Sequence, residues 1–146
     1  MSDETRRGEA WRDQRREAFE AHAAALARRK AAETDRARAI IADFVARMSA
    51  RSVPAHPLRA RVAGGRGTYR TGLTGWYVRR NHALGVGVDG EFYILDVPPS
   101  LRARFFGADV EPSDPPLVVG EGARDGESIP LDELLEQRLA AGADFD

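Results

Sequence analysis

The chain contains no cysteine, and this absence excludes several classes of site. Without a thiol there is no disulfide framework, no thiolate nucleophile, no redox pair and no zinc ribbon. Long apolar stretches are also missing: no run approaches the roughly 18 residues that span a bilayer, and the first residues lack the apolar region of a secretory signal. We therefore expect a cytoplasmic protein with no membrane partner.

Lysine is nearly absent, with Lys30 as the only one beside 21 arginines, a skew that codon bias explains without any role for guanidinium chemistry. The positions of the charges are more informative. Residues 1–51 carry 12 basic and 9 acidic groups, residues 52–106 carry 8 and 3, and residues 107–146 carry 2 and 11. Residues 44–88 contain eight arginines and no carboxylate. This asymmetry indicates either an anionic partner or an acidic C-terminal part that folds against the basic middle.

Glycine and proline are both missing from residue 9 to residue 53, a stretch rich in Ala, Arg and Glu, which predicts helix. A single helix of that length would be about 60 Å long at about 1.5 Å per residue, longer than a domain of this size can cover. We therefore expect three parts: a disordered stretch 1–8, a charged, projecting helix 9–34, and a compact α+β domain 35–146.

A break between the two helical parts is expected after the polar run RRKAAE, with Thr34 or Asp35 capping the next helix. That second helix, up to residue 51, presents an apolar face suited to a core, made of Ile40, Ile41, Phe44, Val45 and Met48. The first part has only a thin apolar stripe, which is better suited to a partner's groove or to a second copy of the chain.

The rest of the chain alternates polar and apolar residues as strands do. After the connector SVPAHP, strands are predicted at 58–62 and 68–71, and residues 75–97 supply three more around the turns NH and DG. The segment PPSLRARFFG predicts a short helix with Leu101 and Phe105 on one side. An amphipathic C-terminal helix is predicted at 130–140, capped at Gly142, with Leu131, Leu134, Leu135 and Leu139 inward.

The expected fold class is therefore α+β: a long N-terminal helical segment, an antiparallel meander of four to five strands, and a C-terminal amphipathic helix. Its central strand carries Gly85 and Gly87. Two-residue turns at NH and DG would place both glycines on one face, as a trough beside Trp76, Val78, Phe92 and Ile94. Either neighbouring rings or a helix fill this trough, or a ligand or partner backbone enters it. The opposite face is also apolar, so both faces need cover from this chain or from another protein.

No motif for catalysis, metal binding or phosphate binding is present. The three histidines, at positions 22, 56 and 82, lack metal-ligand or catalytic spacing, and no HExxH, GxSxG, P-loop or EF-hand pattern occurs. We therefore predict no catalytic residue, no metal and no cofactor. If the protein is an enzyme, the residues to examine are Asp96, His82 and Arg80.

The leading hypothesis is a small cytosolic interaction module, adaptor or regulatory in role, that binds a protein partner or its own copy through the N-terminal stripe and one sheet face. The alternative is a nucleic-acid or phosphate-ligand binder that uses the arginine-rich span 44–88, with the acidic residues 107–146 as an internal competitor. An enzyme of unknown class is the third hypothesis. Candidate binding residues across these hypotheses are Trp76, Tyr77, Arg79, Arg80, Tyr93, Arg66, Arg70, Trp11 and Phe19.

Overall fold

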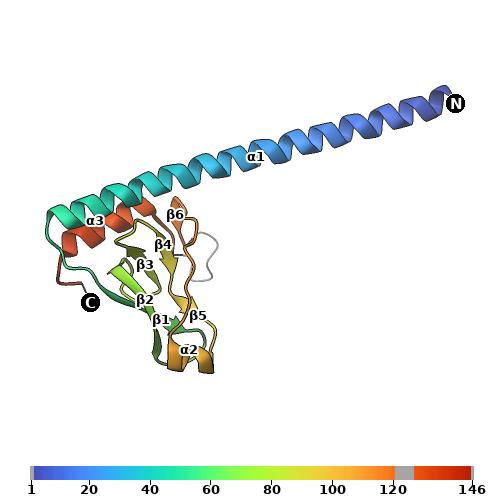
Figure 1. Cartoon of the computed structure of the whole chain (residues 1–146). Helices are drawn as coiled ribbons and strands as arrows, with labels where there is room; N and C mark the ends of the chain where they lie inside the picture. Colours follow the sequence, from blue (N-terminus) through green and yellow to red (C-terminus); the bar gives the residue numbers. More distant parts are fainter. Residues whose placement is uncertain (1, 121–126, 146) are drawn as a thin grey trace. The chain divides into compact units, whose positions relative to one another are not determined.

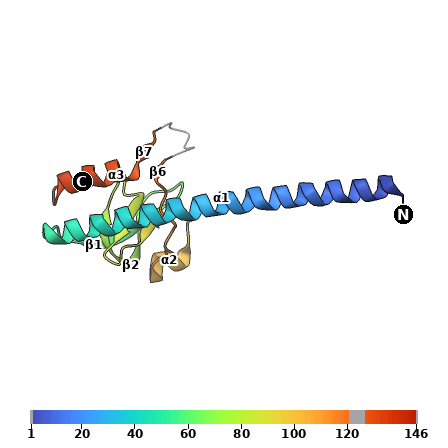
Figure 2. The same ribbon diagram turned by 90° about the horizontal axis from the view of Figure 1, so that it is seen from above.

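The computed structural model describes residues 2–120 and 127–145 of the 146-residue chain (Figures 1 and 2). The chain divides into two units, Met1–Glu33 and Thr34–Asp146. The α+β class is confirmed. In chain order the elements are α1 Asp3–Ala50, β1 His56–Val62, β2 Thr68–Tyr77, β3 Leu84–Gly87, β4 Phe92–Ile94, β5 Asp96–Val97, α2 Leu101–Phe106, β6 Val118–Val119, β7 Ile129–Pro130 and α3 Leu131–Ala141.

Helix α1 begins at Asp3, whereas the sequence predicts disorder up to residue 8. The reason is a cap: the hydroxyl of Ser2 accepts a hydrogen bond from the backbone N–H of Thr5 at 3.3 Å. Two carboxylates in the first turn, Asp3 and Glu4, add a favourable interaction with the helix dipole. Residue 1, also part of that prediction, lies outside the described residues.

The predicted break after RRKAAE is wrong, because α1 continues without interruption to Ala50. Thr34 and Asp35 disfavour helix by less than about 1 kcal/mol each relative to alanine, and good helix formers surround them. The helix ends where Ser52 takes a left-handed conformation, with φ of 56°. The N–H of Val53 then reaches back to the carbonyl of Met48 at 3.0 Å, which satisfies one of the last carbonyls of α1.

The five-stranded sheet has the order β4-β3-β2-β1-β5, and it is mixed because β1 pairs antiparallel with β2 but parallel with β5. Leu95 is the single residue between β4 and β5, and it therefore connects the two strands at opposite ends of the sheet order. Its N–H donates to the carbonyl of Ala83, next to β3, and its carbonyl accepts from the N–H of Arg61 in β1. The sheet therefore curls until the segment 92–97 pairs with β3 at one end and β1 at the other.

The register around β3 differs by one residue from the predicted one. Val86 pairs with Trp76 and Phe92, where two-residue turns would place it opposite the neighbouring tyrosines. The DG turn is part of a three-residue loop, in which Gly90 has a φ of 81°. Because a one-residue shift moves every side chain to the other face, the predicted glycine trough beside Trp76 and Phe92 is wrong.

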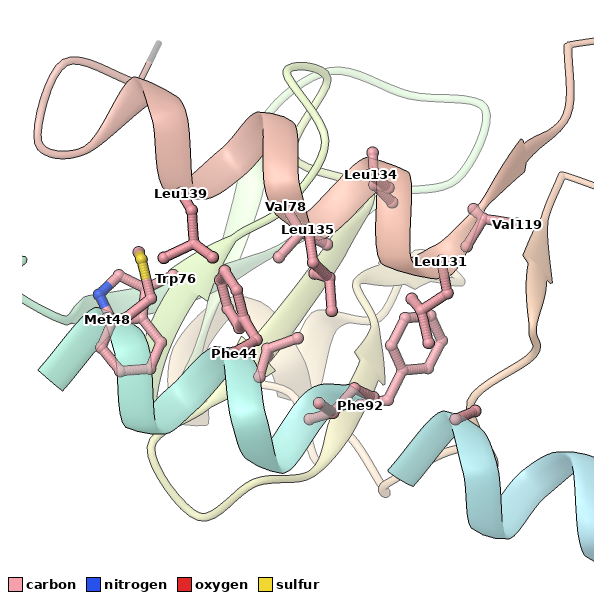
Figure 3. Close-up of a cluster of buried hydrophobic side chains, with 13 residues drawn as sticks. Phe44, Met48, Trp76, Val78, Phe92, Val119, Leu131, Leu134, Leu135 and Leu139 are labelled. Carbon is pink, nitrogen blue, oxygen red and sulfur yellow. The ribbon is translucent and has the colours of Figure 1, made fainter. Parts of the chain in front are cut away.

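One face of the sheet packs against α3 and the C-terminal part of α1, and Figure 3 shows this cluster of buried side chains. The Phe44 ring meets the Trp76 ring edge to face, with centroids 6.1 Å apart. Met48 and Ile41 are completely buried, as the sequence predicts for this part of the helix. The helix α3 supplies the four predicted leucines, Leu131, Leu134, Leu135 and Leu139, all at most 7% exposed.

The other face of the sheet is covered inside the same unit. Leu58, Tyr93 and Leu95 form a second buried cluster, against which Val110 packs. A third cluster joins three alanines from β1, α2 and the segment after α2: Ala60, Ala103 and Ala108. Both apolar faces therefore find their cover within residues 34–145.

The alternate glycines of β3 make room for the side chains of this second face. A Cβ atom at Gly85 would lie 3.0 Å from Cδ1 of Leu95 and 3.1 Å from Cδ1 of Leu58. A Cβ atom at Gly87 would collide with the carboxylate of Asp89 and lie 3.0 Å from the Tyr93 ring. Neighbouring side chains thus fill the space above the glycines, although they are not the neighbours that the sequence predicts.

Candidate interaction surfaces

The first unit is a helix with no buried residue in its described part, residues 2–33. Three large apolar side chains lie on it in the open: Trp11 is 57% exposed, Phe19 is 76% exposed and Leu26 is 48% exposed. At 3.6 residues per turn, the three lie within a sector of about 80°. We call them the N-terminal stripe.

The surroundings of the N-terminal stripe are charged but nearly neutral. Residues 2–33 carry eight basic and seven acidic groups, which are distributed along the helix. The Arg15 guanidinium stacks 4.7 Å from the centroid of the Trp11 ring, so the indole has a cation on one face. The stripe is therefore an apolar line with a polar border, the arrangement by which a helix docks in a partner's groove.

Two of the aromatic residues predicted for binding are not on the surface. Trp76 and Tyr93 are each 3% exposed. The indole Nε1–H of Trp76 donates to the carbonyl of Val53 at 3.2 Å, and the Tyr93 hydroxyl donates to Oδ2 of Asp89 at 2.6 Å. Burial first, and then the hydrogen bond and the charge of Asp89, raise the pKa of Tyr93 to about 12. Both residues stabilise the fold, and neither offers a contact surface.

Tyr77 has a structural environment as well. Its hydroxyl accepts a hydrogen bond from the backbone N–H of Arg59 at 2.8 Å. Its ring stacks on the His82 ring at 3.9 Å and 6°, and His82 has a left-handed backbone, with φ of 62°. His82 therefore closes the turn after β2 against Tyr77. Asp96, one of the residues to examine in an enzyme, forms a 3.4 Å ion pair with Arg61.

Arg79 and Arg80 line a cavity of about 510 Å³ together with Arg138 of α3 and Phe145. Arg138 is only 4% exposed, and its guanidinium donates to the carbonyls of Tyr77 and Gly142, both at 2.7 Å. The ring of Phe145 lies 4.2 Å from the same guanidinium and 5.2 Å from that of Arg80. Burial lowers the pKa of Arg138 from its ordinary value. Nothing in the sequence indicated that Arg138 is buried, because an arginine in an amphipathic helix is normally exposed.

The arginines of residues 44–88 differ in their neighbours, and Arg59 lies opposite Arg70 in the pairing of β1 with β2. Arg47 pairs with Asp43 and with Glu136, whereas Arg61 pairs with Asp96. Arg66 is exposed in the turn between β1 and β2, and Arg70 donates to the carbonyl of Phe105 at 3.2 Å. Nucleic-acid or phosphate binding by this span stays a prediction.

A surface that the sequence pattern did not reveal lies on α2. The sequence predicts Leu101 and Phe105 on one side of this helix; they are 75% and 67% exposed, and Phe106 is 81% exposed. We call these three residues the α2 knob. The inward residue is Ala103, which packs in a buried cluster with Ala60 and Ala108. The sequence did contain one sign of this arrangement: the small Ala103 lies between the large Leu101 and Phe105.

The part of the chain that the structure describes contains neither a metal site nor a membrane-spanning helix. Across residues 2–120 and 127–145, no three His, Asp or Glu side chains are grouped so as to hold a metal ion. Within the same ranges, none of the helices combines the length and apolarity that crossing a membrane requires. A scan against protein-family models, a search of curated proteins and a search of solved structures each found no match.

Proposed function

We propose that this protein is a cytoplasmic interaction module without catalytic activity, and that it binds a protein partner through the N-terminal stripe. The observation that carries the proposal is the exposure of Trp11, Phe19 and Leu26 in a helical unit whose described residues are all outside any core. A helix needs no tryptophan or phenylalanine to remain helical, since alanine, glutamate and lysine serve better. Two exposed rings two turns apart are typical of anchors for a partner.

The energetics of such a contact are favourable. Burying each stripe side chain would contribute about 1.5–3 kcal/mol. A helix without tertiary contacts is marginally stable in water, so a partner that packs on the stripe would also stabilise residues 3–33 as helix. Tryptophan and phenylalanine lose few rotamers on burial, which keeps the cost of ordering them low.

The sheet face of the original hypothesis is not part of this proposal. Both sides of the sheet pack against other residues of 34–145, and the aromatic residues expected to form the contact, Trp76 and Tyr93, are buried. The proposed contact therefore rests on the first unit alone.

The experiment is a comparison of three tagged full-length proteins purified from the protein's own cells: the unchanged chain, Trp11→Ala/Phe19→Ala, and the matched control Asp13→Ala/Glu17→Ala. The control removes two side chains of the same helix that point away from the N-terminal stripe. Each preparation is split, and one half is treated with nuclease before bound proteins are identified and quantified.

We expect a stoichiometric partner that survives nuclease, remains with the control variant, and falls at least about tenfold with the stripe variant. Equal recovery with the stripe variant would contradict the proposal. Loss of all bound protein on nuclease treatment would contradict it too, and would favour the nucleic-acid hypothesis instead.

A further inference from the structure

The α2 knob is held rigidly, although it is exposed. The Ser100 hydroxyl accepts from the N–H of Ala103 at 3.1 Å and caps the start of α2. At the other end, the N–H of Gly107 donates to the carbonyl of Ala103 at 2.8 Å. The backbone of β2 holds the helix from the side, since the carbonyl of Arg70 accepts from the N–H of Ala108 at 2.7 Å. The knob residues are thus presented by a fixed backbone, as an interface anchor requires.

The charge around the α2 knob is positive. Arg102 and Arg104 lie within α2, and Arg70 lies against its last turn through the bond to the carbonyl of Phe105. The helix itself contains no carboxylate. Neither Arg102 nor Arg104 forms an ion pair within residues 2–120 and 127–145. A surface that covers this knob therefore needs an apolar centre and acidic neighbours.

The same unit carries a groove with those properties on α3 and the C-terminal part of α1. The groove has a volume of about 380 Å³. Its floor is apolar and is lined by Ile40, Phe44, Leu135 and Leu139. Its rim carries three carboxylates, Asp43, Asp132 and Glu136, and one cation, Arg47, which pairs with Asp43 at 3.0 Å and Glu136 at 2.7 Å. The rim is therefore negative by two charges.

The knob and the groove of one chain cannot meet. Figure 1 shows α2 at one end of the sheet and α3, beside the C-terminal part of α1, at the other. We infer that the groove of one copy receives the α2 knob of a second copy, so that copies associate head to tail. The apolar side chains of the knob lie over the apolar floor, and its arginines face the acidic rim. Charge complementarity selects this occupant, since an identical face with three arginines would repel the knob.

The contact is heterologous, because it joins two different surfaces. Each copy therefore keeps one free knob or one free groove, and association continues or closes as a ring. A six-residue helix and a short groove bury less surface than a standard stable interface. The association is consequently weak and depends on protein concentration.

Two variants test the contact in the full chain. Phe105→Ser/Phe106→Ser removes the knob, and Ala39→Arg places a cation at an exposed position of the groove. All three sites are exposed, so polar side chains there leave the core intact, and circular dichroism checks folding. Each variant alone should lose head-to-tail association in sedimentation experiments. A mixture of the two should regain one contact, because each variant retains the surface that the other has lost, and this contact should be at least about tenfold tighter than either self-contact.

The absence of cysteine permits a direct check of the residues in contact. A chain with Phe105→Cys should form a disulfide with a differently tagged chain carrying Ala39→Cys. The matched control replaces Phe105→Cys by Ala63→Cys, an exposed site in the turn after β1. The cross-link should also form in chains that carry Trp11→Ala/Phe19→Ala. It therefore tests the contact between knob and groove separately from the function proposed for the N-terminal stripe.

Three results would overturn the inference. One is a disulfide that forms no more readily between the Phe105→Cys and Ala39→Cys chains than between the Ala63→Cys and Ala39→Cys control chains. Another is a mixture of the two variants that sediments like its components. The third is binding of the unchanged chain, but not of the Phe105→Ser/Phe106→Ser variant, to phosphatidylserine vesicles without any self-association, which would assign the knob to a lipid surface.

Discussion

Helix α1 has two parts with similar local sequence and opposite surroundings. Residues 3–33 and residues 34–50 are both rich in alanine and arginine, and both are helical throughout. The second part buries Ala37, Ile41, Phe44 and Met48, whereas the described residues of the first part include no buried side chain. Helix formation alone therefore says nothing about packing. The density of the apolar stripe separates the two parts: four buried side chains over about three turns form a core, whereas three anchors over about four turns do not.

The largest predicted effect contrasts one ring from each part of α1. Phe44→Ala should destabilise the unit 34–146 by about 3–5 kcal/mol, since Phe44 is 2% exposed and its ring packs against Trp76. Phe19→Ala should change the free energy of unfolding of that unit by less than about 0.5 kcal/mol. Urea unfolding followed by the fluorescence of Trp76, in a Trp11→Phe background, measures both.

An equal loss of stability in the two variants would show that Phe19 belongs to the folded core. Leu26→Ala provides the control for size, because Leu26 lies on the same stripe and should also leave the midpoint unchanged.

The next-largest effect is the change in stability when a glycine is replaced by alanine, compared between the two units. Gly85→Ala should cost about 1–3 kcal/mol, because its Cβ would press against Leu95 and Leu58, each at about 3 Å. Gly8→Ala should instead favour helix by about 0.5–1 kcal/mol, since the nearest atom to its Cβ is Nη2 of Arg12 at 3.7 Å. Thermal unfolding and ellipticity at 222 nm measure the two effects. Two changes of the same sign would contradict the contrast.

The smallest effect is a fall in the stability of the second unit at alkaline pH. The pKa of Tyr93 is raised above its ordinary value of 10.0 to about 12, so folding favours the neutral phenol. The stability that this adds is fully present below pH 10 and is lost as pH rises towards 12. Tyr93→Phe should flatten the fall in stability between pH 10 and 12.

Asp89→Asn is the second variant for this titration. It removes the charge beside the phenol, so the tyrosinate absorbance should appear at lower pH than in the unchanged chain. An unchanged titration in Asp89→Asn would show that Asp89 does not act on Tyr93.

Much of the fold follows from the sequence by simple periodicity. The apolar face of α1 at residues 40–48, the inward leucines of α3 and its end at Gly142 are all confirmed. These predictions hold because each depends only on the spacing of side chains along one helix. The mixed character of the sheet was not predicted, since it depends on a curl that brings Leu95 between two distant strands.

The register of β3 could not be read from the sequence, because DG suits a two-residue turn and a three-residue loop alike. The structure uses the longer loop, in which Oδ1 of Asp89 accepts from the N–H of Glu91. This loop moved Phe92 to the face opposite the glycines. The connection 79–83 between Val78 and Leu84, in place of the predicted two-residue NH turn, did the same for Trp76. Trp76 and Tyr93 are buried and leave the candidate site, whereas Trp11 and Phe19, which depend on no strand pairing, are exposed.

Hydrogen exchange along α1 tests the central claim most directly, measured by mass spectrometry for the chain alone at low concentration and for the chain recovered with its partner. Alone, amides of residues 9–30 should exchange within minutes, while those of residues 37–50 should be protected by packing against the sheet. In the recovered complex, residues 9–30 should become protected. Strong protection of residues 9–30 in the isolated chain, or none in the complex, would contradict the claim that these residues form a partner-binding helix.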